Sequence, residues 1–315
     1  MINELTDEAT EYGQLARRAL EAAGGDELSH RAEADPRQRE SLVAPVLAEL
    51  GAWDLDPRES AGEAEAAAAL CRSAGYWAVA YPVAERLSRP TDVEADGLLV
   101  VDGVAPSARV AGLDLRFLAV DLDGHRSIAT ARTGTMNPRK DLFVGALDLE
   151  ALDDAGAGDV SLGLVLPCWT LLGMLDRAME LTRAYVVERE QFGQPLATFQ
   201  AVQFQLADAE VERVGLEELA KYALWSIETR RPEALEDALA LRAAALEAAE
   251  IVLRVAHQLH GAIGFCDETA LSWVSRASVP LRQLPLGLSA TRAELVRRIG
   301  RRGLTGLFSP DKPRE

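Results

Sequence analysis

The sequence predicts a mainly α-helical protein with a small β insert, because the spacing of apolar residues along the chain changes twice. Residues 3–88 carry apolar side chains at helical spacings, whereas residues 91–158 hold short apolar runs broken by Gly, Asp and Pro. Long helical patterns then fill the rest of the chain. We therefore expect an N-terminal helical domain over 1–90, a small β domain over 91–158 and a C-terminal antiparallel helical bundle over 159–315.

The N-terminal domain is expected to contain three helices. The first starts near the beginning of the chain and stops at Gly24-Gly25, since two glycines end its helical pattern. A second fits 36–50. An Ala-rich third fits 59–74 and is expected to continue toward Pro82.

Four long helices are expected in the C-terminal bundle, over about 161–189, 196–228, 232–261 and 287–303. Their lengths and short connections are typical of an antiparallel four-helix bundle. Before them, runs such as GLLVVDG and KDLFVGALDL are bounded by turn residues and are typical of strands.

Composition and charge exclude several classes of protein. With a formal net charge of −17, the chain has no general attraction for nucleic acid or anionic lipid, so we expect neither as a partner. Cys71, Cys168 and Cys266 are scattered and odd in number, which fits a reducing cytoplasm better than a disulfide framework. The acidic N-terminus lacks the apolar core of a secretory signal, and no apolar run approaches the roughly 20 residues that span a bilayer. We expect a cytoplasmic protein with no membrane partner.

The stretch EREQFGQPLATFQAVQFQLAD, residues 188–208, lies at an expected corner between two bundle helices. A plain turn needs only Gly193 and Pro195, yet this one also carries Arg189, Phe192 and several Gln. The residues alone leave two interpretations open. Either Arg189 caps its helix and Phe192 joins the core, or the corner contacts a ligand.

A second stretch, QLHGAIGF at 258–265, favours the ligand-contacting corner by resemblance. Together with the corner's Arg, Phe-Gly, Phe-Gln and Leu-Ala-Asp, it closely resembles the acyl-CoA dehydrogenase family, in the family's order and at about its separation. A third, weaker likeness is GYWAVAYPVAERL at 75–87. The resemblance covers roughly residues 75–308 and is strongest over 160–276. It implies the acyl-CoA dehydrogenase-like fold, with helices, a middle β domain and a four-helix bundle that serves oligomerisation.

In that family the corner reaches across a subunit interface and contacts FAD that is bound mainly by the neighbouring subunit. The resemblance implies that Arg189 neutralises the FAD pyrophosphate through forked hydrogen bonds. It also implies that Phe192 packs against the adenosine portion and that Gln200 forms a hydrogen bond to it.

The second motif is expected to contribute Gln258 and the Gly261–Ala262 backbone to the same FAD site, where the family commonly has Gly-Gly. His260 is interpreted as a cap or contact residue and not as a catalytic acid or base. His257 lies three residues away, but no third ligand of matching type is near it in sequence, so we expect no metal site.

The family's reaction is the α,β-dehydrogenation of an acyl-CoA thioester, which needs a Glu to remove the α-proton. Family members carry this base in one of two places. One is just before Gly287, where this chain has Leu286, and the other is early in the first bundle helix, close to Gly163. Neither residue can abstract a proton, so we expect no catalytic residue in this chain.

Other charged residues near the motifs are interpreted as structural or solvated. Glu188 and Glu190 flank the corner's Arg, and Glu268 follows the second motif. The basic run on the last helix consists of Arg297, Arg298, Arg301 and Arg302. This run is either a solvated face that complements the helix C-terminus or a contact for CoA phosphates or an acidic partner.

The β domain also departs from the family. Stretches like Glu-Pro-x-Ala-Gly-Ser-Asp and Trp-x-Thr-Asn-Gly, which hold the flavin in family members, are absent from 91–158. The chain thus resembles the short, base-lacking subunit of bacterial α2β2 heterotetramers, notably of steroid catabolism, whose partner is a full-length acyl-CoA dehydrogenase homologue. The resemblance implies FAD, a bulky or steroid-derived acyl-CoA and an electron-transfer flavoprotein as a candidate electron acceptor. Two alternatives stay open: a self-sufficient homomeric enzyme with an unusual base or non-redox chemistry, and a structural paralogue without flavin.

Overall fold

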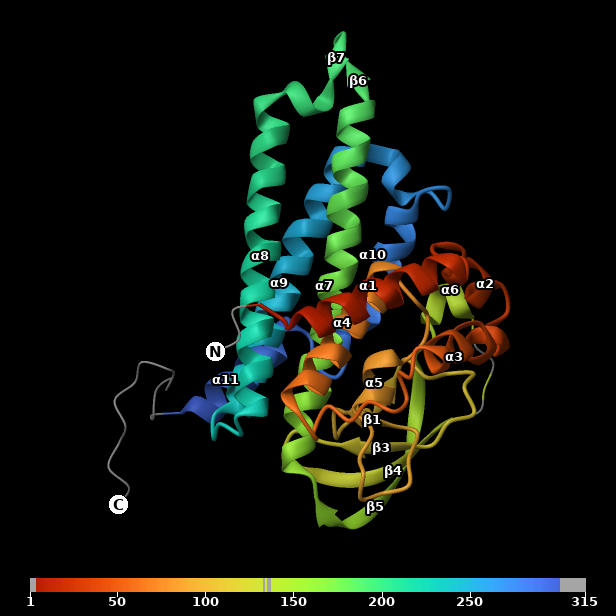
Figure 1. Cartoon of the computed structure of the whole chain (residues 1–315), viewed down its shortest axis with the longest axis vertical. Helices are drawn as coiled ribbons and strands as arrows, with labels where there is room; N and C mark the ends of the chain where they lie inside the picture. Colours follow the sequence, from red (N-terminus) through yellow and green to blue (C-terminus); the bar gives the residue numbers. More distant parts are fainter. Residues whose placement is uncertain (1–3, 133, 135–136, 301–315) are drawn as a thin grey trace.

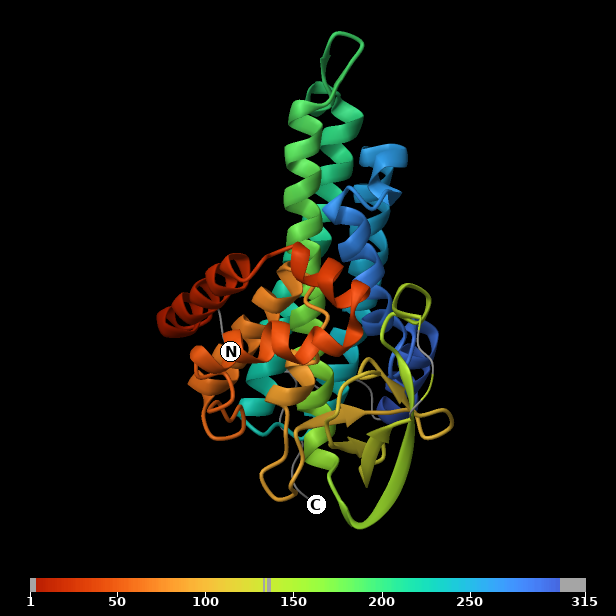
Figure 2. The same cartoon turned by 90° about the vertical axis from the view of Figure 1, so that its right-hand side faces the viewer.

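The computed structural model describes residues 4–132, 134 and 137–300. Three long helices, α7 (Ala157–Glu188), α8 (Gln200–Glu228) and α9 (Ala234–His260), run side by side along the longest axis. The N-terminal helices and a small sheet pack beside the lower part of α7, and the upper part of the bundle projects beyond them (Figure 1, Figure 2). The predicted fold class, mainly α with a small β insert, is confirmed.

Two of the N-terminal helices begin at side chains that cap them. Thr6 accepts a hydrogen bond from the backbone N–H of Ala9, and Ser60 accepts one from that of Glu63. The helices are α1 (Asp7–Ala22), α2 (Glu27–Ala34), α3 (Arg39–Glu49), α4 (Ala61–Tyr76) and α5 (Val83–Leu87), with a 3-10 turn, η1 (Pro36–Gln38), before α3. The sequence analysis does not predict α2. Helix α4 ends at Tyr76 and does not continue toward the next proline, because the chain turns through Ala78 at positive φ.

The small sheet has five strands in the order β1-β3-β4-β5-β2, with β1 parallel to β3 and the other neighbours antiparallel. The strands are β1 (Gly97–Val100), β2 (Ser107–Ala108), β3 (Phe117–Val120), β4 (His125–Ala131) and β5 (Gly145–Ala155), and a short helix, α6 (Pro138–Asp141), precedes β5. One face, which includes Leu98 and Leu118, joins the main core with α5 and α7. The other face forms a separate small core around Phe117 and Leu147.

The C-terminal bundle contains one helix that the sequence analysis does not predict. Helix α10 (Ala270–Gln283) packs against α7 and α9, and α11 (Leu288–Ile299) follows Gly287, close to the predicted start of the last helix. Pro280 lies inside α10, and Ser272 and Ser278 lie on its buried face. These residues weaken the pattern that predicts a helix, although packing against α7 still stabilises one.

Helix α7 corrects the expectation that no apolar run in this chain approaches the length that spans a bilayer. Among the described residues it alone is long and apolar enough to span a membrane by length and composition, with a mean hydropathy of 1.5 over its most apolar window. However, 78% of that window is buried inside the protein. The apolar character of α7 therefore follows from its place at the centre of the bundle, where neighbouring helices cover most of its surface.

The N-terminal half is joined to the bundle where α4 crosses α7 with their backbones in direct contact. A Cβ added at Gly75 would lie 1.9 Å from the carbonyl oxygen of Thr170, and one added at Gly173 would lie 1.9 Å from that of Arg72. No side chain fits at either position, because the opposing atoms belong to backbone that cannot rotate away. The two glycines thus set the distance between the helices.

Ion pairs extend this junction to α8. The Arg72 guanidinium pairs with Asp176 of α7 at 2.6 Å and with Glu217 of α8 at 2.8 Å. A second cluster fixes the start of α7, where buried Arg126 of β4 contacts Asp159 and the carboxylates of Asp92 and Asp154. Charges of opposite sign therefore accompany both of these junctions between the bundle and the rest of the chain.

We expect Gly173→Ala to lower the free energy of unfolding by about 3 kcal/mol or more, since the added methyl group overlaps backbone. Gly62→Ala in α4 is the matched control, because no atom lies within 4 Å of its added Cβ. The control should change stability by less than about 1 kcal/mol, and in the stabilising direction. Urea denaturation followed by circular dichroism measures both changes, and equal midpoints for the two variants would contradict the close crossing.

Candidate functional site

The ends of three bundle helices meet at one end of the molecule, far from the sheet. The C-terminal ends of α7 and α9 and the N-terminal end of α8 lie together, and the hairpin between α7 and α8 projects furthest (Figure 1). This hairpin consists of β6 (Glu190–Gln191) and β7 (Gln194–Pro195), and a 3-10 turn, η2 (Leu196–Thr198), leads into α8. The two sequence motifs, about 70 residues apart along the chain, are thereby brought to the same end.

The tip of the hairpin is a two-residue turn in which both central residues are left-handed. Phe192 has φ 54° and Gly193 has φ 80°, and Gln191 pairs with Gln194 across them. Positive φ at both positions is typical of the turn that matches strand twist, but for an aromatic residue it costs roughly 1–3 kcal/mol. Phe192 is 93% exposed. The interpretation in which this side chain joins the core is therefore wrong.

All six expected FAD contacts lie on this end and face solvent. Their side chains or backbones are exposed in the free chain: Arg189, Phe192, Gln200, Gln258, Gly261 and Ala262. Within the described part of the chain, the side chains of Arg189, Gln200 and Gln258 form no hydrogen bond or ion pair. An exposed guanidinium with free donors can bind a phosphate from outside the subunit.

The second motif forms a tight turn at the end of α9. Gly261 has φ 65°, which ends the helix, and the 3-10 turn η3 (Gly261–Phe265) follows. No atom lies within 4 Å of a Cβ added at Gly261, so its backbone is open to an approaching group. Ile263 and Phe265 are 47% and 68% exposed on the same turn.

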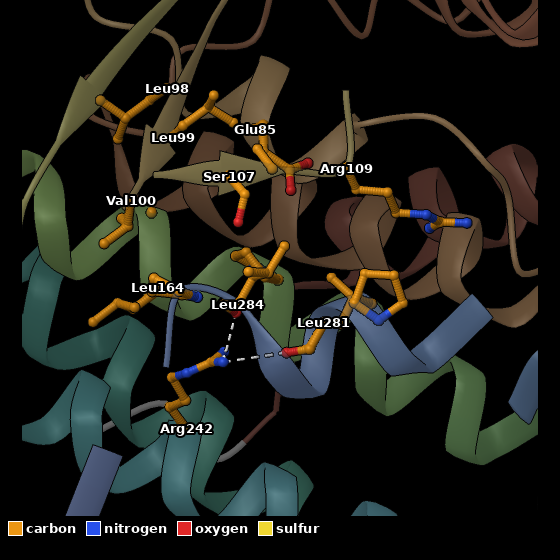
Figure 3. Close-up of a pocket in the computed structure, with 15 residues that line it drawn as sticks. Glu85, Leu98, Leu99, Val100, Ser107, Arg109, Leu164, Arg242, Leu281 and Leu284 are labelled. Carbon is orange, nitrogen blue, oxygen red and sulfur yellow. Dashed lines mark hydrogen bonds between the residues drawn. The ribbon is translucent and has the colours of Figure 1, made fainter. Parts of the chain in front are cut away.

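A small cavity lies at the opposite end of α7, between the sheet and α10 (Figure 3). Its walls are mainly apolar but include Glu85, Ser107 and Arg109, and its volume is about 50 Å³. The lining includes Gly163 and Leu164 of α7, Leu98 and Val100 of β1, and Leu284 after α10. This volume corresponds to about two water molecules, whereas sites for larger organic ligands measure roughly 300–1,000 Å³.

Gly163, one of the two positions expected to lack the base, lines this cavity. A Cβ added there would lie 2.6 Å from a methyl group of Val100 and 3.1 Å from one of Leu98. A carboxylate at this position would therefore collide with β1. The absence of a base near residue 163 is matched by the absence of space for one.

Leu286, the other such position, follows the cavity-lining residues Leu284 and Pro285. Its carbonyl accepts a hydrogen bond of 2.7 Å from Arg242 of α9, and the same Nη2 donates to Leu284 at 2.6 Å and to Leu281 at 3.3 Å. Arg242 is 3% exposed, and burial lowers its pKa. A buried cation thus holds the segment after α10 through backbone oxygens. The two positions, distant in sequence, converge on one small cavity.

One carboxylate in the cavity was not singled out from the sequence as a candidate base. Glu85 of α5 points into the space with the hydroxyl of Ser107 opposite (Figure 3). Burial raises the pKa of Glu85, while Arg109 and Arg39 act in the opposite direction. Its sequence signal is the Glu three residues after Pro82 in the weaker motif. Nothing in that motif places the carboxylate beside Gly163.

The other charged residues that were considered from the sequence are exposed or form contacts within the fold. Glu188, Glu190 and Glu268 are exposed, and none of them lines the cavity. Arg298 donates to the carbonyl of Leu122 and contacts Asp123, and Arg297 pairs with Asp123 and Glu294, so both join α11 to the β3–β4 turn. Arg301 and Arg302 lie outside the described residues. Over the described ranges, no group of three or more His, Cys, Asp or Glu is placed to hold a metal ion.

Comparison with known proteins agrees with this geometry. The family described as acyl-CoA dehydrogenase, C-terminal domain, matches residues 165–298, which span the bundle from α7 into α11. The chain carries an acyl-CoA dehydrogenase C-terminal domain. The family resemblance seen in the two motifs is confirmed.

Among curated acyl-CoA dehydrogenases, FadE27 of Mycobacterium tuberculosis is 33% identical over 144 residues, covering 41% of this chain and 36% of the relative. The probable acyl-CoA dehydrogenase YngJ of Bacillus subtilis is 37% identical over 97 residues, covering 31% of this chain and 25% of the relative. The matches thus span about a quarter to a third of those relatives' length.

Solved structures match almost the entire fold. The Tcur3481-Tcur3483 steroid ACAD G363A variant has a TM-score of 0.75 at 23% identity, covering 95% of this chain and 99% of that one. The ChsE4-ChsE5 complex from Mycobacterium tuberculosis has a TM-score of 0.70 at 20% identity, covering 96% and 98%. At these identities the likeness establishes the acyl-CoA dehydrogenase fold over the helical and β regions together.

We expect Arg242→Ala to lower the free energy of unfolding by roughly 2–4 kcal/mol, since three carbonyl groups lose their charged donor. Arg254→Ala is the matched control, because Arg254 lies on the exposed side of the same helix. It should change stability by less than about 0.5 kcal/mol. Urea denaturation gives the stabilities, and hydrogen exchange should rise at residues 281–287 in the Arg242 variant only. Unchanged exchange in this segment would show that Arg242 does not hold it.

Proposed function

We propose that this chain is the short subunit of a heteromeric, FAD-dependent acyl-CoA dehydrogenase. The reaction is α,β-dehydrogenation of an acyl-CoA thioester, for which the partner subunit supplies the carboxylate that removes the α-proton. FAD, when bound, accepts the hydride from the β-carbon. This chain contributes the cross-interface half of the FAD site and no catalytic residue.

The observation that carries this proposal is the opposite character of the two ends of α7. At the lower end, the cavity has room for about two waters and no carboxylate at either of the family's base positions. At the upper end, the residues expected to contact FAD are exposed and have unoccupied donors. The cavity beside Gly163 is too small for a flavin, whereas the exposed donors at the far end are available to a flavin carried by another subunit.

Each exposed group suits one part of the cofactor. Arg189, at the C-terminal end of α7, offers a forked donor for the pyrophosphate. Phe192 presents an aromatic face for the adenosine portion, and Gln200 offers an amide for a hydrogen bond. The open backbone at Gly261 allows close approach of the ligand.

A surface on α8 supports the assembly. Phe204, Val211, Val214 and Leu219 lie on one side of this helix and are 58%, 69%, 42% and 43% exposed. An exposed apolar stripe of this length is typical of a subunit interface. With the steroid ACAD and the ChsE4-ChsE5 complex among the structural neighbours, we infer an α2β2 heterotetramer with a full-length homologue, a bulky or steroid-derived acyl-CoA and a cytoplasmic location. An electron-transfer flavoprotein is the proposed electron acceptor.

One observation favours a second candidate, a self-sufficient enzyme on this fold. Glu85 is a carboxylate that lines the cavity, and burial raises its pKa. This candidate requires the cavity to expand from about 50 Å³ to admit a thioester. It predicts that Glu85→Gln abolishes acyl-CoA-dependent dye reduction by the chain on its own, whereas the heteromeric proposal predicts no such activity to abolish.

Co-expression with an adjacent full-length homologue tests the assembly. We expect the lone chain to purify without flavin, because the cavity beside Gly163 is too small to hold one and this chain is proposed to contribute only part of the FAD site. The co-purified complex should show a flavin absorption spectrum and a mass of two copies of each subunit. Replacing the partner's base Glu with Gln should abolish reduction of a dye by acyl-CoA thioesters. Full FAD occupancy of the lone chain, one per subunit, would reject the proposal.

Arg189→Ala in the complex should weaken FAD binding by roughly tenfold to a hundredfold, since a charge-assisted hydrogen bond contributes about 1.5–3 kcal/mol. Arg183→Ala is the matched control on the same helix, where the guanidinium is exposed and pairs with Glu210. Removing it should leave FAD affinity within about twofold. Fluorescence titration with FAD measures both, and equal affinities for the two variants would return Arg189 to a capping role.

A further inference from the structure

Two ring stacks connect the end of α7, the end of α9 and the η3 turn. The His260 ring stacks on Tyr185 of α7, with centroids 4.4 Å apart and planes inclined by 18°. One helical turn earlier, the His257 ring stacks on Phe265 of η3 at 4.2 Å and 14°. Tyr185 also accepts the backbone N–H of Arg189 at 2.8 Å. The stacks therefore link the residue before the hairpin to the turn that ends the second motif.

Gly264 lies against both histidines and completes this contact. A Cβ added at Gly264 would lie 2.9 Å from the Cβ of His260 and 3.3 Å from Nδ1 of His257. Gly264 is buried, whereas its neighbours Ile263 and Phe265 are exposed. The backbone of the turn thus lies against the Cβ of His260 and the imidazole of His257, and the Phe265 ring covers the other part of this imidazole while staying partly exposed.

The hydrogen bonding of the two rings fits their neutral forms. His260 is 6% exposed, and its Nδ1 donates to the carbonyl of Ala256 at 2.8 Å, because a carbonyl only accepts. The Nδ1 of His257 is buried and has no hydrogen-bond partner among the described residues. A second proton on that ring would have no acceptor.

We propose that His257 and His260 are positioning residues that fix the η3 turn against the end of α7, so that the Gly261–Ala262 backbone and Arg189 meet FAD as one preorganised surface. This inference rests on the proposed function and adds to it a role for two residues that do not contact the cofactor. Preorganisation of this surface lowers the conformational entropy that is lost when FAD binds.

The two stacks formed by His257 and His260 with Phe265 and Tyr185 are called the histidine clamp here. The charges around the two imidazole rings make the stability of this clamp depend on pH. Burial lowers the pKa of both histidines, and Arg282 of α10 and the neighbouring imidazole lower that of His257 further. Arg282 in turn faces Glu250 of α9, and among the described residues no carboxylate shifts the pKa of either histidine. A lowered pKa means that the unfolded chain binds more protons between the folded pKa and the ordinary value of 6.5. The contribution of the clamp is therefore complete above pH 6.5 and is lost as the pH falls below it.

Hydrogen exchange on the lone chain and FAD titration of the complex test the clamp separately. His260→Ala should raise exchange at residues 258–266 and weaken FAD binding at pH 7.5 by roughly tenfold, the worth of one aromatic stack. The double variant His257→Phe, His260→Phe keeps the stacks and removes the titrating groups. It should keep affinity within about threefold at pH 7.5 and remove the loss of affinity that the unmodified complex shows between pH 7 and pH 5.5. His125→Ala, at the exposed first position of β4, is the control. It should show the same pH profile of FAD affinity as the unmodified complex.

The outcomes separate this inference from the proposed function. Raised exchange in His260→Ala with unchanged FAD affinity would overturn the positioning role while leaving the FAD site intact. A Phe,Phe variant with the unmodified pH profile would overturn the pH dependence. A complex that binds no FAD in its unmodified form contradicts the proposed function itself, and the exchange of the lone chain then still decides whether the histidines hold the turn.

Discussion

The direct backbone contact between α4 and α7 at Gly75 and Gly173 is the constraint on which the rest of the structure depends. It fixes the N-terminal helices, and with them the sheet, to the lower half of α7. The ion pairs of Arg72 form beside this crossing at 2.6–2.8 Å, and those of Arg126 hold the start of α7 at 2.5–3.1 Å. At the upper end, the side chains of Arg189, Gln200 and Gln258 form no ion pair or hydrogen bond within the described residues, and they stay available to another molecule.

This arrangement gives one helix two surroundings of opposite character. Near Gly163 the side chains fill the space so closely that a single methyl group would collide with Val100. Near Arg189 the chain presents exposed donors and an aromatic ring in an unfavourable backbone conformation. Such strain persists only where the surrounding structure enforces it, and it clusters at sites of binding. The packing along α7 thus changes from a tightly filled region near Gly163 to an exposed surface near Arg189.

Much of the architecture could be predicted because long amphipathic patterns and compact corners specify a bundle locally. Once helices alternate in direction, residues near 189 and 261 must lie at the same end, and the structure places them there. Helix α10 could not be predicted, since Pro280 and its polar residues obscure a helix that tertiary packing stabilises. Glu85 was missed as a cavity residue for a related reason. Its place depends on how a five-residue helix packs against β1 and α7, which no local pattern encodes.

The exposed tip at Phe192 also bears on the life of the chain before assembly. An aromatic ring that is 93% exposed, with Phe265 and the apolar side of α8 nearby on the same bundle, resembles the surface that an incompletely folded protein presents. Chaperones and proteases act on such surfaces, so a copy without the proposed partner subunit would be removed faster than one in the proposed complex. If the proposed partner subunit covers the tip, it completes a binding site and also protects this chain from removal. The amount of this chain in the cell would then follow the amount of the proposed partner.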